Sequence, residues 1–299
     1  MDYGSVLKKG WEITWKNKGL WILGILSGCT SGAGNPTQGF NYTTSSQEYP
    51  GLERTLAGVP DEMWILIFGV LAVVGLLFLV AVVVLSILGQ AGLIAGVAQA
   101  DETGSVKLKE AWKLGLPHFW RLLGLAVVLL VVVLLVALVI GFLTVATLGL
   151  AALCLIPLLC ILIPLSIIIS GYLSLVQNGI VLGKQGVFEA MGKGWAMLRA
   201  HFWPITLMAI ILFVIGALAG FILSLPLLLA SLPLLAVAFA QSDQGLTAFL
   251  PFLGCFVLYL PVMIIVGGIL KTYVSGVWTL TYRRLSGSGL AAIAVPSPS

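Results

Sequence analysis

The sequence predicts an all-α membrane protein in which six transmembrane helices form three repeats, each an amphipathic interfacial helix followed by a transmembrane hairpin. Three observations predict this fold class. Apolar residues make up 60% of the 299 residues and charged residues 9%, whereas about a quarter of a soluble domain is charged. Apolar runs longer than about 18 residues recur, as expected of membrane-spanning helices. Finally, one motif occurs three times.

The motif starts at a glycine, continues as an amphipathic stretch that holds tryptophan, and passes a further tryptophan into wholly apolar sequence. The tryptophans of the second copy, Trp112 and Trp120, each precede their counterparts in the third copy by 83 residues. Gly96 precedes Gly179 by the same distance. Three landmarks with one offset indicate an internal repeat. The repeats cover roughly residues 4–99, 104–183 and 186–284.

The first part of each repeat has the periodicity of an amphipathic helix. In the first copy Leu7, Trp11 and Trp15 fall on one face, with Glu12 and Lys16 opposite. In the third copy the apolar stripe consists of Phe188, Met191, Trp195 and Leu198. Such helices lie in the membrane interface, with the apolar face toward the lipid and Lys and Arg near anionic headgroups. A soluble linker helix is the alternative.

Basic residues determine the predicted orientation. Fourteen of the fifteen Lys and Arg residues fall in four clusters, at 8–18, 107–121, 184–199 and 271–284. The positive-inside rule places these clusters, and with them both termini, in the cytoplasm. The segment 31–62, which holds Arg54 and four carboxylates, is expected on the extracytoplasmic side. Residues 1–285 then form a single polytopic membrane domain, followed by a disordered tail at 286–299.

The apolar runs define the expected spans. The outward spans start near Gly19, Arg121 and Phe202, and the returning spans lie within 63–99, 150–183 and 248–282. As a straight helix, residues 63–99 would be about 55 Å long, more than a bilayer core of about 30 Å. We expect this helix to tilt, to break, or to project into the cytoplasm beyond Gln90. The turn between spans three and four is predicted at Thr144–Gly149.

The apolar segment after the fifth span is expected to be separate from it. Residues 226–240 are bracketed by Pro226 and Pro233. A crossing requires about 20 residues, so this segment is too short for another one. We expect it at the outer interface or as a re-entrant segment.

The end of the first apolar segment admits two interpretations. Leu26-Ser27-Gly28-Cys29 fits the lipobox that directs cleavage before a lipidated cysteine. A signal peptide, however, has a short basic region before its apolar core, whereas here that region is amphipathic and recurs twice in mid-chain. We therefore expect the segment to be retained as span one, although it offers only about 15 residues where about 20 are usual.

The four cysteines show neither paired nor metal-ligand spacing. They are Cys29, Cys154, Cys160 and Cys255. We expect thiols that pack as small apolar side chains. A Cys29–Cys255 disulfide at the outer face is the alternative.

Residues 176–208 carry a resemblance to a known family. Val187, Phe188, Glu189 and Ala190 are followed by Trp195 and Arg199, and then by Phe202 and Trp203 at the entry of the next span. This pattern resembles the polytopic membrane domain that precedes the catalytic domain of some bacterial glycerophosphoryl diester phosphodiesterases, and that many stand-alone membrane proteins share. The resemblance implies a membrane module without the enzyme, because spans, interfacial helices and short loops occupy the whole chain.

No constellation for catalysis, cofactor binding or metal binding is found. His118 and His201 occupy equivalent repeat positions beside Phe-Trp. This equivalence favours a shared interfacial role over a metal site, which would need carboxylate or Cys partners nearby. No carboxylate lies centrally in a span, as a proton relay would require. The sequence therefore predicts no enzymatic activity, no cofactor and no nucleic-acid partner.

Uncharged polar residues do occur within the spans. Gln90, Gln177 and Asn178 lie near the cytoplasmic ends of returning spans. Amides in lipid seek partners, so these residues either join helices or line a substrate path. The segments "GLIAG" (92–96) and "GALAG" (216–220) are small-residue faces that permit close helix packing.

These features predict a non-enzymatic protein of the bacterial cytoplasmic membrane with a scaffolding, lipid-organising or partner-recruiting role. Membrane lipids are the expected partners, a protein partner is possible, and the oligomeric state is open. The candidate lipid-headgroup contacts are Lys8, Lys9, Lys107, Lys109, Lys193 and Arg199. The alternative is a transporter or flippase for a lipid-like or apolar solute, which requires a polar cavity near Gln177 and Asn178.

Overall fold

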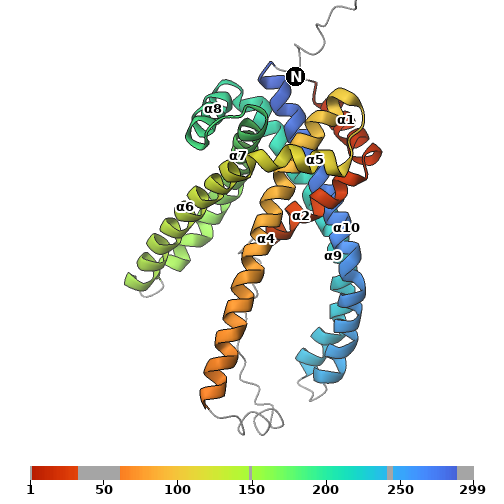
Figure 1. Ribbon diagram of the computed structural model, residues 1–299. Coiled ribbons are helices and arrows are strands. Elements are labelled where there is room, and N and C mark those ends of the chain that lie inside the picture. Colours follow the sequence, from red (N-terminus) through yellow and green to blue (C-terminus); the bar gives the residue numbers. More distant parts are fainter. Residues whose placement is uncertain (1, 33–60, 148–149, 241–244, 288–299) are drawn as a thin grey trace, which may run out of the picture.

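The structure is a computed structural model that describes residues 2–32, 61–147, 150–240 and 245–287 (Figure 1). All regular elements in these ranges are helices. They are α1 (Tyr3–Lys16), α2 (Gly19–Gly32), α4 (Asp61–Thr103), α5 (Leu108–Gly115) with a 3-10 turn (Leu116–His118), α6 (Phe119–Ala146), α7 (Leu150–Leu182), α8 (Val187–Ala200), α9 (Phe202–Ala240) and α10 (Gly245–Leu285). The predicted all-α class is confirmed.

Within the described residues, five segments are long and apolar enough to cross a membrane. They are Leu66–Thr103, Leu108–Leu143, Pro164–Leu182, Phe202–Leu232 and Leu253–Leu285. A multi-pass membrane protein requires helices of this kind. Helix α2 is also apolar, but its 14 residues reach only about 21 Å at 1.5 Å per residue, against a bilayer core of about 30 Å.

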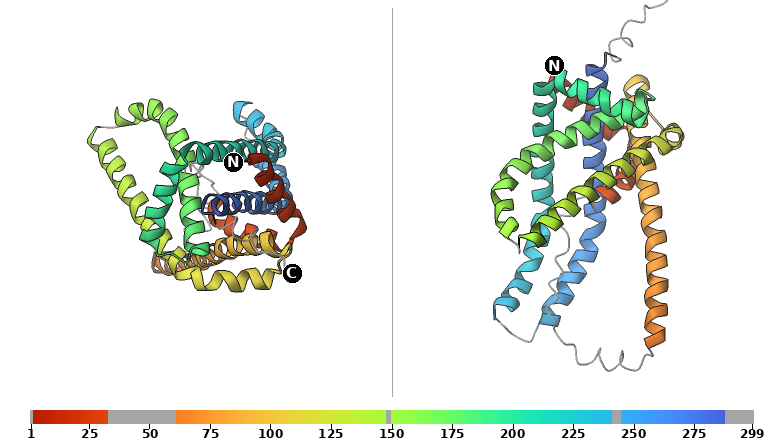
Figure 2. Two further views of the ribbon diagram at one scale, coloured as in Figure 1. Left: turned by 90° about the horizontal axis from the view of Figure 1, so that it is seen from above. Right: turned by 90° about the vertical axis from the view of Figure 1, so that its left-hand side faces the viewer.

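The helices pack closely at one end of the molecule and diverge at the other (Figure 1). We call residues 2–28, 86–126, 166–212 and 266–287 the packed end. The remaining described parts of α4, α6, α7, α9 and α10 form the legs. One leg is α4 alone, another is the α6–α7 hairpin and the third is the α9–α10 hairpin, as the side view also shows (Figure 2). Both termini of the described chain lie at the packed end, where Arg284 Nη1 donates to Ser5 Oγ at 2.8 Å.

The buried side chains belong to the packed end. Leu20 and Leu23 of α2 are at most 1% exposed, as are Leu93 of α4 and Val277 of α10. The side chains of the legs are instead exposed: Phe78 by 71%, Phe142 by 71% and Leu258 by 80%. Such surface is stable only against lipid, so the legs supply the apolar belt and the packed end supplies the core.

Glycines allow the closest helix contacts in the packed end. A Cβ atom at Gly24 of α2 would overlap the carbonyl oxygen of Gly268 of α10. A Cβ atom at Gly115 of α5 would lie 2.5 Å from the backbone nitrogen of Gly92 of α4. The prediction that 92–96 is a packing face is therefore confirmed. The same prediction for 216–220 is wrong, because nothing lies within 4 Å of a Cβ built at Gly216 or Gly220.

Most of the predicted boundaries agree with the helices. Helices α2 and α9 begin at Gly19 and Phe202, and α6 begins at Phe119, close to the expected Arg121. Helix α6 ends at Ala146, within the predicted turn Thr144–Gly149, and α7 starts directly after it at Leu150. Helix α4 is unbroken, and its part beyond Gln90 is buried in the packed end.

One prediction about the outer parts of the chain needs correction, and one alternative is excluded. Residues 226–240 are not a separate segment, because α9 continues unbroken to Ala240; prolines are tolerated in membrane helices when neighbouring groups satisfy the freed carbonyls. Cys255 is a free, exposed thiol, so the disulfide with Cys29 is not formed. The side chains of the other three cysteines, most of the 31–62 segment and most of the tail lie outside the described residues.

Candidate functional site

Helices α1, α5 and α8 all lie at the packed end, on the side away from the legs (Figure 1). Seen from above, they lie around the end of α10 (Figure 2). We call these three helices the surface layer. Each carries a basic residue in its last turn, namely Lys16, Lys113 and Arg199, where a positive charge interacts favourably with the helix dipole.

A face of small residues attaches each surface helix to a long helix. In α1 a Cβ at Gly10 would lie 2.8 Å from Val277 Cγ2 and 3.7 Å from Tyr273 Cε2 of α10. In α8 a Cβ at Gly194 would lie 2.9 Å from Val176 Cγ2 and 3.5 Å from Tyr172 Cε2 of α7. In α5 the corresponding close contacts are made by Ala111 on Gly96 of α4. The glycines of α1 and α8 thus contact the same two residue types, a valine and a tyrosine. For α8 these two residues belong to α7, which precedes it in the chain, whereas for α1 they belong to α10.

Aromatic rings beside these glycines reinforce the contacts. Trp11 packs edge-to-face on Tyr273 with ring centroids 5.9 Å apart, and Trp195 packs in the same way on Tyr172 at 6.1 Å. The Tyr172 hydroxyl also donates to the carbonyl of Met191 at 3.1 Å. Both indoles nevertheless stay about half exposed, 55% for Trp11 and 49% for Trp195, and thus remain available to an interface.

The predicted headgroup contacts have different surroundings. Lys8, Lys107 and Lys109 are exposed. Arg199 stacks over the ring of Trp195, 4.9 Å from its centroid. Lys193 donates to Glu189 Oε1 at 2.8 Å, and this hydrogen bond lowers the pKa of the Glu189 carboxyl below its ordinary value. The sixth residue, Lys9, forms an ion pair with Asp101 of α4.

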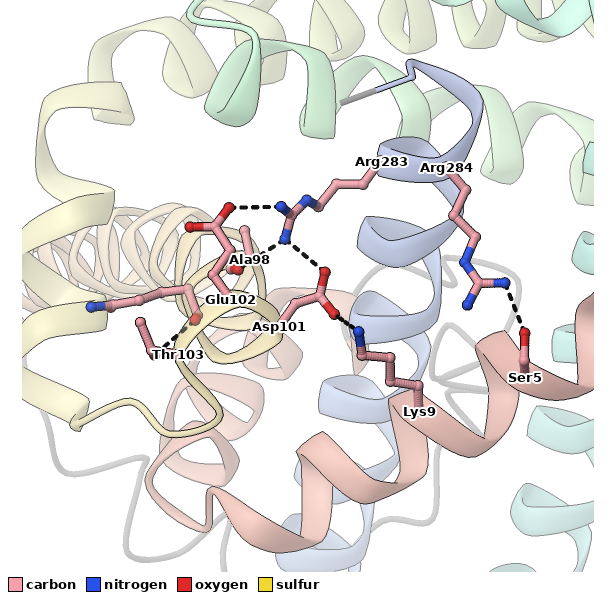
Figure 3. A network of polar contacts seen from close by, with 9 residues as sticks. Ser5, Lys9, Ala98, Asp101, Glu102, Thr103, Arg283 and Arg284 are labelled. Atoms are coloured by element: carbon pink, nitrogen blue, oxygen red, sulfur yellow. Dashed lines mark hydrogen bonds and ion pairs between the residues drawn. The ribbon is translucent and has the colours of Figure 1, made fainter. Parts of the chain in front are cut away.

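The Lys9 ion pair belongs to a cluster that joins three helices (Figure 3). Arg283 of α10 reaches Asp101 Oδ2 at 2.7 Å and Glu102 Oε1 at 2.6 Å, and donates to the Ala98 carbonyl at 3.0 Å. The Arg283 side chain is only 9% exposed and that of Asp101 14%. Carboxylates at the C-terminal end of a helix oppose its dipole, and the cations of α1 and α10 offset this cost. The cluster therefore holds α1, α4 and α10 together.

A cavity of about 190 Å³ lies where α2, α4, α6, α7 and α10 meet. Its polar lining residues are Ser27, Ser86, Gln90, Gln177 and Lys271. Its apolar lining residues are Ile87 of α4 and Leu122, Leu125, Ala126 and Leu129 of α6. Among the polar residues, Gln90 Nε2 donates to Gln177 Oε1 at 3.1 Å. Two of the three predicted intramembrane polar residues thus meet directly, and they join α4 to α7.

The third predicted residue, Asn178, lines a smaller cavity next to the first. This cavity of about 50 Å³ shares Gln90, Gln177 and Lys271 with its neighbour. Asn178 is 2% exposed and donates to the Ser174 carbonyl at 2.7 Å. Its Oδ1 atom has no hydrogen-bond partner among the described residues, so an acceptor is left in a buried polar site, which is costly unless a ligand or water satisfies it.

Lys271 has different surroundings from Arg283 and Arg284, with which the sequence analysis grouped it. Lys271 lies twelve positions before Arg283 in α10, about 18 Å along a helix. Lys271 lies within the apolar segment Leu253–Leu285 and lines both cavities. A charge among apolar helices is costly to bury and often marks a functional site. The count of basic residues along the chain does not distinguish Lys271 from Arg283 and Arg284, although its apolar neighbours in the sequence do.

Among the described residues, no three His, Cys, Asp or Glu side chains lie close enough together to hold a metal ion. His118 Nδ1 lies 3.2 Å from the Leu114 carbonyl, and His201 follows the last turn of α8. Both histidines lie at the ends of surface helices, and their interfacial role stays a prediction.

Comparison of the chain with known protein families, with curated proteins and with solved structures finds no match. The resemblance of residues 176–208 to the phosphodiesterase membrane domain stays a prediction. The surface layer and the cavity are therefore the basis on which a function can be proposed.

Proposed function

We propose that the chain is a non-enzymatic protein of a bacterial cytoplasmic membrane that organises anionic lipids at the inner leaflet, or recruits a partner there, through its surface layer. The observation that carries this proposal is the pairing of exposed aromatic and basic side chains on one end of the molecule. Trp120 and Trp203 are 76% and 78% exposed and Phe188 is 78% exposed. Interfacial helices combine these residue types.

The proposal includes a threefold architecture with both termini in the cytoplasm. The equivalent contacts of Gly10 with Tyr273 and Val277, and of Gly194 with Tyr172 and Val176, support a repeated unit. In this unit a returning helix, a surface helix and an outward helix follow one another. The third unit is completed across the chain, by α10 followed in space by α1 and α2. Helix α2 is the sixth, short span, which enters the membrane without the length of the other five.

The surface layer is tested by neutralising its exposed cations. The variant carries Lys8→Gln, Lys107→Gln, Lys109→Gln, Lys193→Gln and Arg199→Gln, and leaves Lys9 in its ion pair. Each basic residue near an anionic surface contributes about 1 kcal/mol, so the variant should lose its preference for anionic over zwitterionic lipid. The preference is measured by spin-label EPR of lipids immobilised around the reconstituted protein. Zwitterionic vesicles serve as the control, and an unchanged preference for anionic lipid would refute the proposal.

A second candidate function is transport or flipping of a lipid-like solute. The polar cavity near Gln177 and Asn178 favours it, because transporters place their binding sites between helices near the membrane midplane. Reconstituted protein should then accelerate the exchange of fluorescent phospholipid between leaflets, measured by quenching of the outer leaflet with dithionite. Exchange no faster than in protein-free vesicles would remove this candidate.

A further inference from the structure

We infer that the cavity between α2, α4, α6, α7 and α10 is a binding site for the phosphate-bearing headgroup of an amphiphile, with Lys271 as its main contact. This goes beyond the proposed function, because it requires neither the surface layer nor movement of the ligand between leaflets. The site shares no residue with the six candidate headgroup contacts of the surface layer.

The chemistry of the polar lining residues selects the charge of the ligand. A lysine ammonium is a donor with no acceptor capacity, and it is the first positive charge in α10 within the segment Leu253–Leu285. The hydrogen bond between Gln90 and Gln177 uses the carbonyl oxygen of Gln177. Gln177 also lines the cavity, and its amide nitrogen can act as a second donor. Hydrogen bonds from charged donors to phosphate oxygens are among the strongest in proteins.

Asn178 adds a requirement for a donor on the ligand. Its buried Oδ1 has no partner among the described residues, and Asn178 lines the smaller cavity together with Lys271 and Gln177. Oδ1 can only accept. A headgroup such as phosphoglycerol or phosphoethanolamine carries both a phosphate and a hydroxyl or amine. Its phosphate can accept from the Lys271 ammonium while its hydroxyl or amine donates to the Asn178 amide oxygen.

The size and position of the cavity indicate that the rest of the ligand is a lipid chain. About 190 Å³ is below the roughly 300–1,000 Å³ of pockets that enclose a whole small molecule, so it admits a headgroup and not a complete lipid. The apolar lining residues come mainly from α6, from Leu122 to Leu129. On the same helix Val127 is 53% and Leu130 63% exposed. An acyl chain can thus leave the cavity along α6 directly into the lipid.

The inference is tested with the full-length protein in detergent and a fluorescent lysophosphatidylglycerol. Lys271→Met should weaken binding about tenfold or more, the loss expected for a hydrogen bond to a charged group, and Lys271→Arg should retain most of it. Lys18→Met, at an exposed position between α1 and α2 and outside the surface layer, is the matched control and should bind within about twofold of the unchanged protein. A monoacylglycerol with the same chain and no phosphate should bind as weakly to the unchanged protein as the lysolipid binds to Lys271→Met.

A second variant tests the cavity without changing a charge. Ala126→Phe fills it from the α6 side, whereas Ala137→Phe places the same ring on the exposed part of α6. We expect loss of binding for Ala126→Phe and none for Ala137→Phe, with both variants showing the thermal unfolding midpoint of the unchanged protein.

Equal binding by Lys271→Met and the unchanged protein would overturn the inference. So would full displacement of the lysolipid by millimolar inorganic phosphate, which would indicate a site for free phosphate. These outcomes are separate from the EPR measurement on the surface layer and from the leaflet-exchange assay. Either proposed function can therefore fail while the cavity still binds the lysolipid. Equally, the cavity can fail to bind it while a proposed function holds.

Discussion

The packed end and the legs are built from the same apolar residue types, but their helices differ in how closely they contact one another. In the packed end a new Cβ would meet a neighbouring helix at Gly10, Gly24, Gly96, Gly115, Gly194 and Gly268. In the legs a Cβ would meet nothing within 4 Å at Gly69, Gly75, Gly141, Gly216, Gly220 and Gly254. Lipid gives helices no hydrophobic reason to associate, so packing and polar contacts must hold them together. Apolar composition therefore identifies a membrane helix, whereas close contacts at glycines determine which part of the helix packs against its neighbours.

The largest loss of stability in the packed end is expected when its ion cluster is broken. Arg283→Met leaves Asp101 buried without its main partner, and breaking a buried pair costs about 3–5 kcal/mol. We expect the free energy of unfolding in detergent to fall by about that amount, with hydrogen exchange rising first in α1 and the end of α4. Arg284→Met is the control, because Arg284 is exposed and should cost about 1 kcal/mol or less. Equal losses for the two variants would mean that the cluster does not hold the packed end.

The next largest effect is expected from the helix contact at Gly24. In Gly24→Leu the new side chain meets the backbone of α10, which cannot move aside as a side chain would. We expect a loss of about 3 kcal/mol, at the upper end of the usual cost of overpacking. Gly75→Leu in the leg of α4 adds the same atoms against lipid and should leave the thermal unfolding midpoint unchanged. A similar loss at Gly75 would show that the legs are also closely packed.

The smallest effect is expected from the exposed pair of Glu189 and Lys193. Lys193→Met should raise the pKa of Glu189 toward its ordinary value, as measured by carboxyl chemical shifts in NMR. Because the folded-state pKa lies below the unfolded value, any stabilisation by the pair is present above the unfolded pKa. It is lost as the pH falls through the folded-state pKa. A Glu189 pKa that does not respond to the substitution would show that the hydrogen bond is not its cause.

Much of the fold could be predicted from the sequence, because helix starts in this chain have strong local signals. The amphipathic periodicity around Trp11 and Trp195 predicted a helix at each of these places, where the structure has α1 and α8. The polar residues Gln90 and Gln177 were expected to find partners within the membrane, and they bond to each other. The periodicity of α1 and α8 depends on neighbours within a few turns. The need of an amide in an apolar helix for a partner is also a local property, although the sequence does not show that Gln90 and Gln177 find each other.

The remaining features depend on contacts between distant segments. The small-residue faces at Gly10 and Gly194 carry almost no hydrophobic signal, so the periodicity favoured the indoles beside them. The motifs at 92–96 and 216–220 are equivalent as sequence, yet only the first meets another helix. Lys271 was grouped with Arg283 by proximity along the chain, whereas a straight helix places the two far apart. None of these outcomes could be predicted without knowing which helices are neighbours.

The contact between α1 and α10 affects the order in which the protein can fold during synthesis. The ribosome delivers α1 hundreds of residues before α10, so Gly10 can contact Tyr273 and Val277 only after nearly the whole chain has been inserted. Contacts between such distant segments form slowly, and the early helices are exposed to wrong partners in the meantime. A circular permutant that joins the end of α10 to Ser5 and opens the chain elsewhere would shorten that delay.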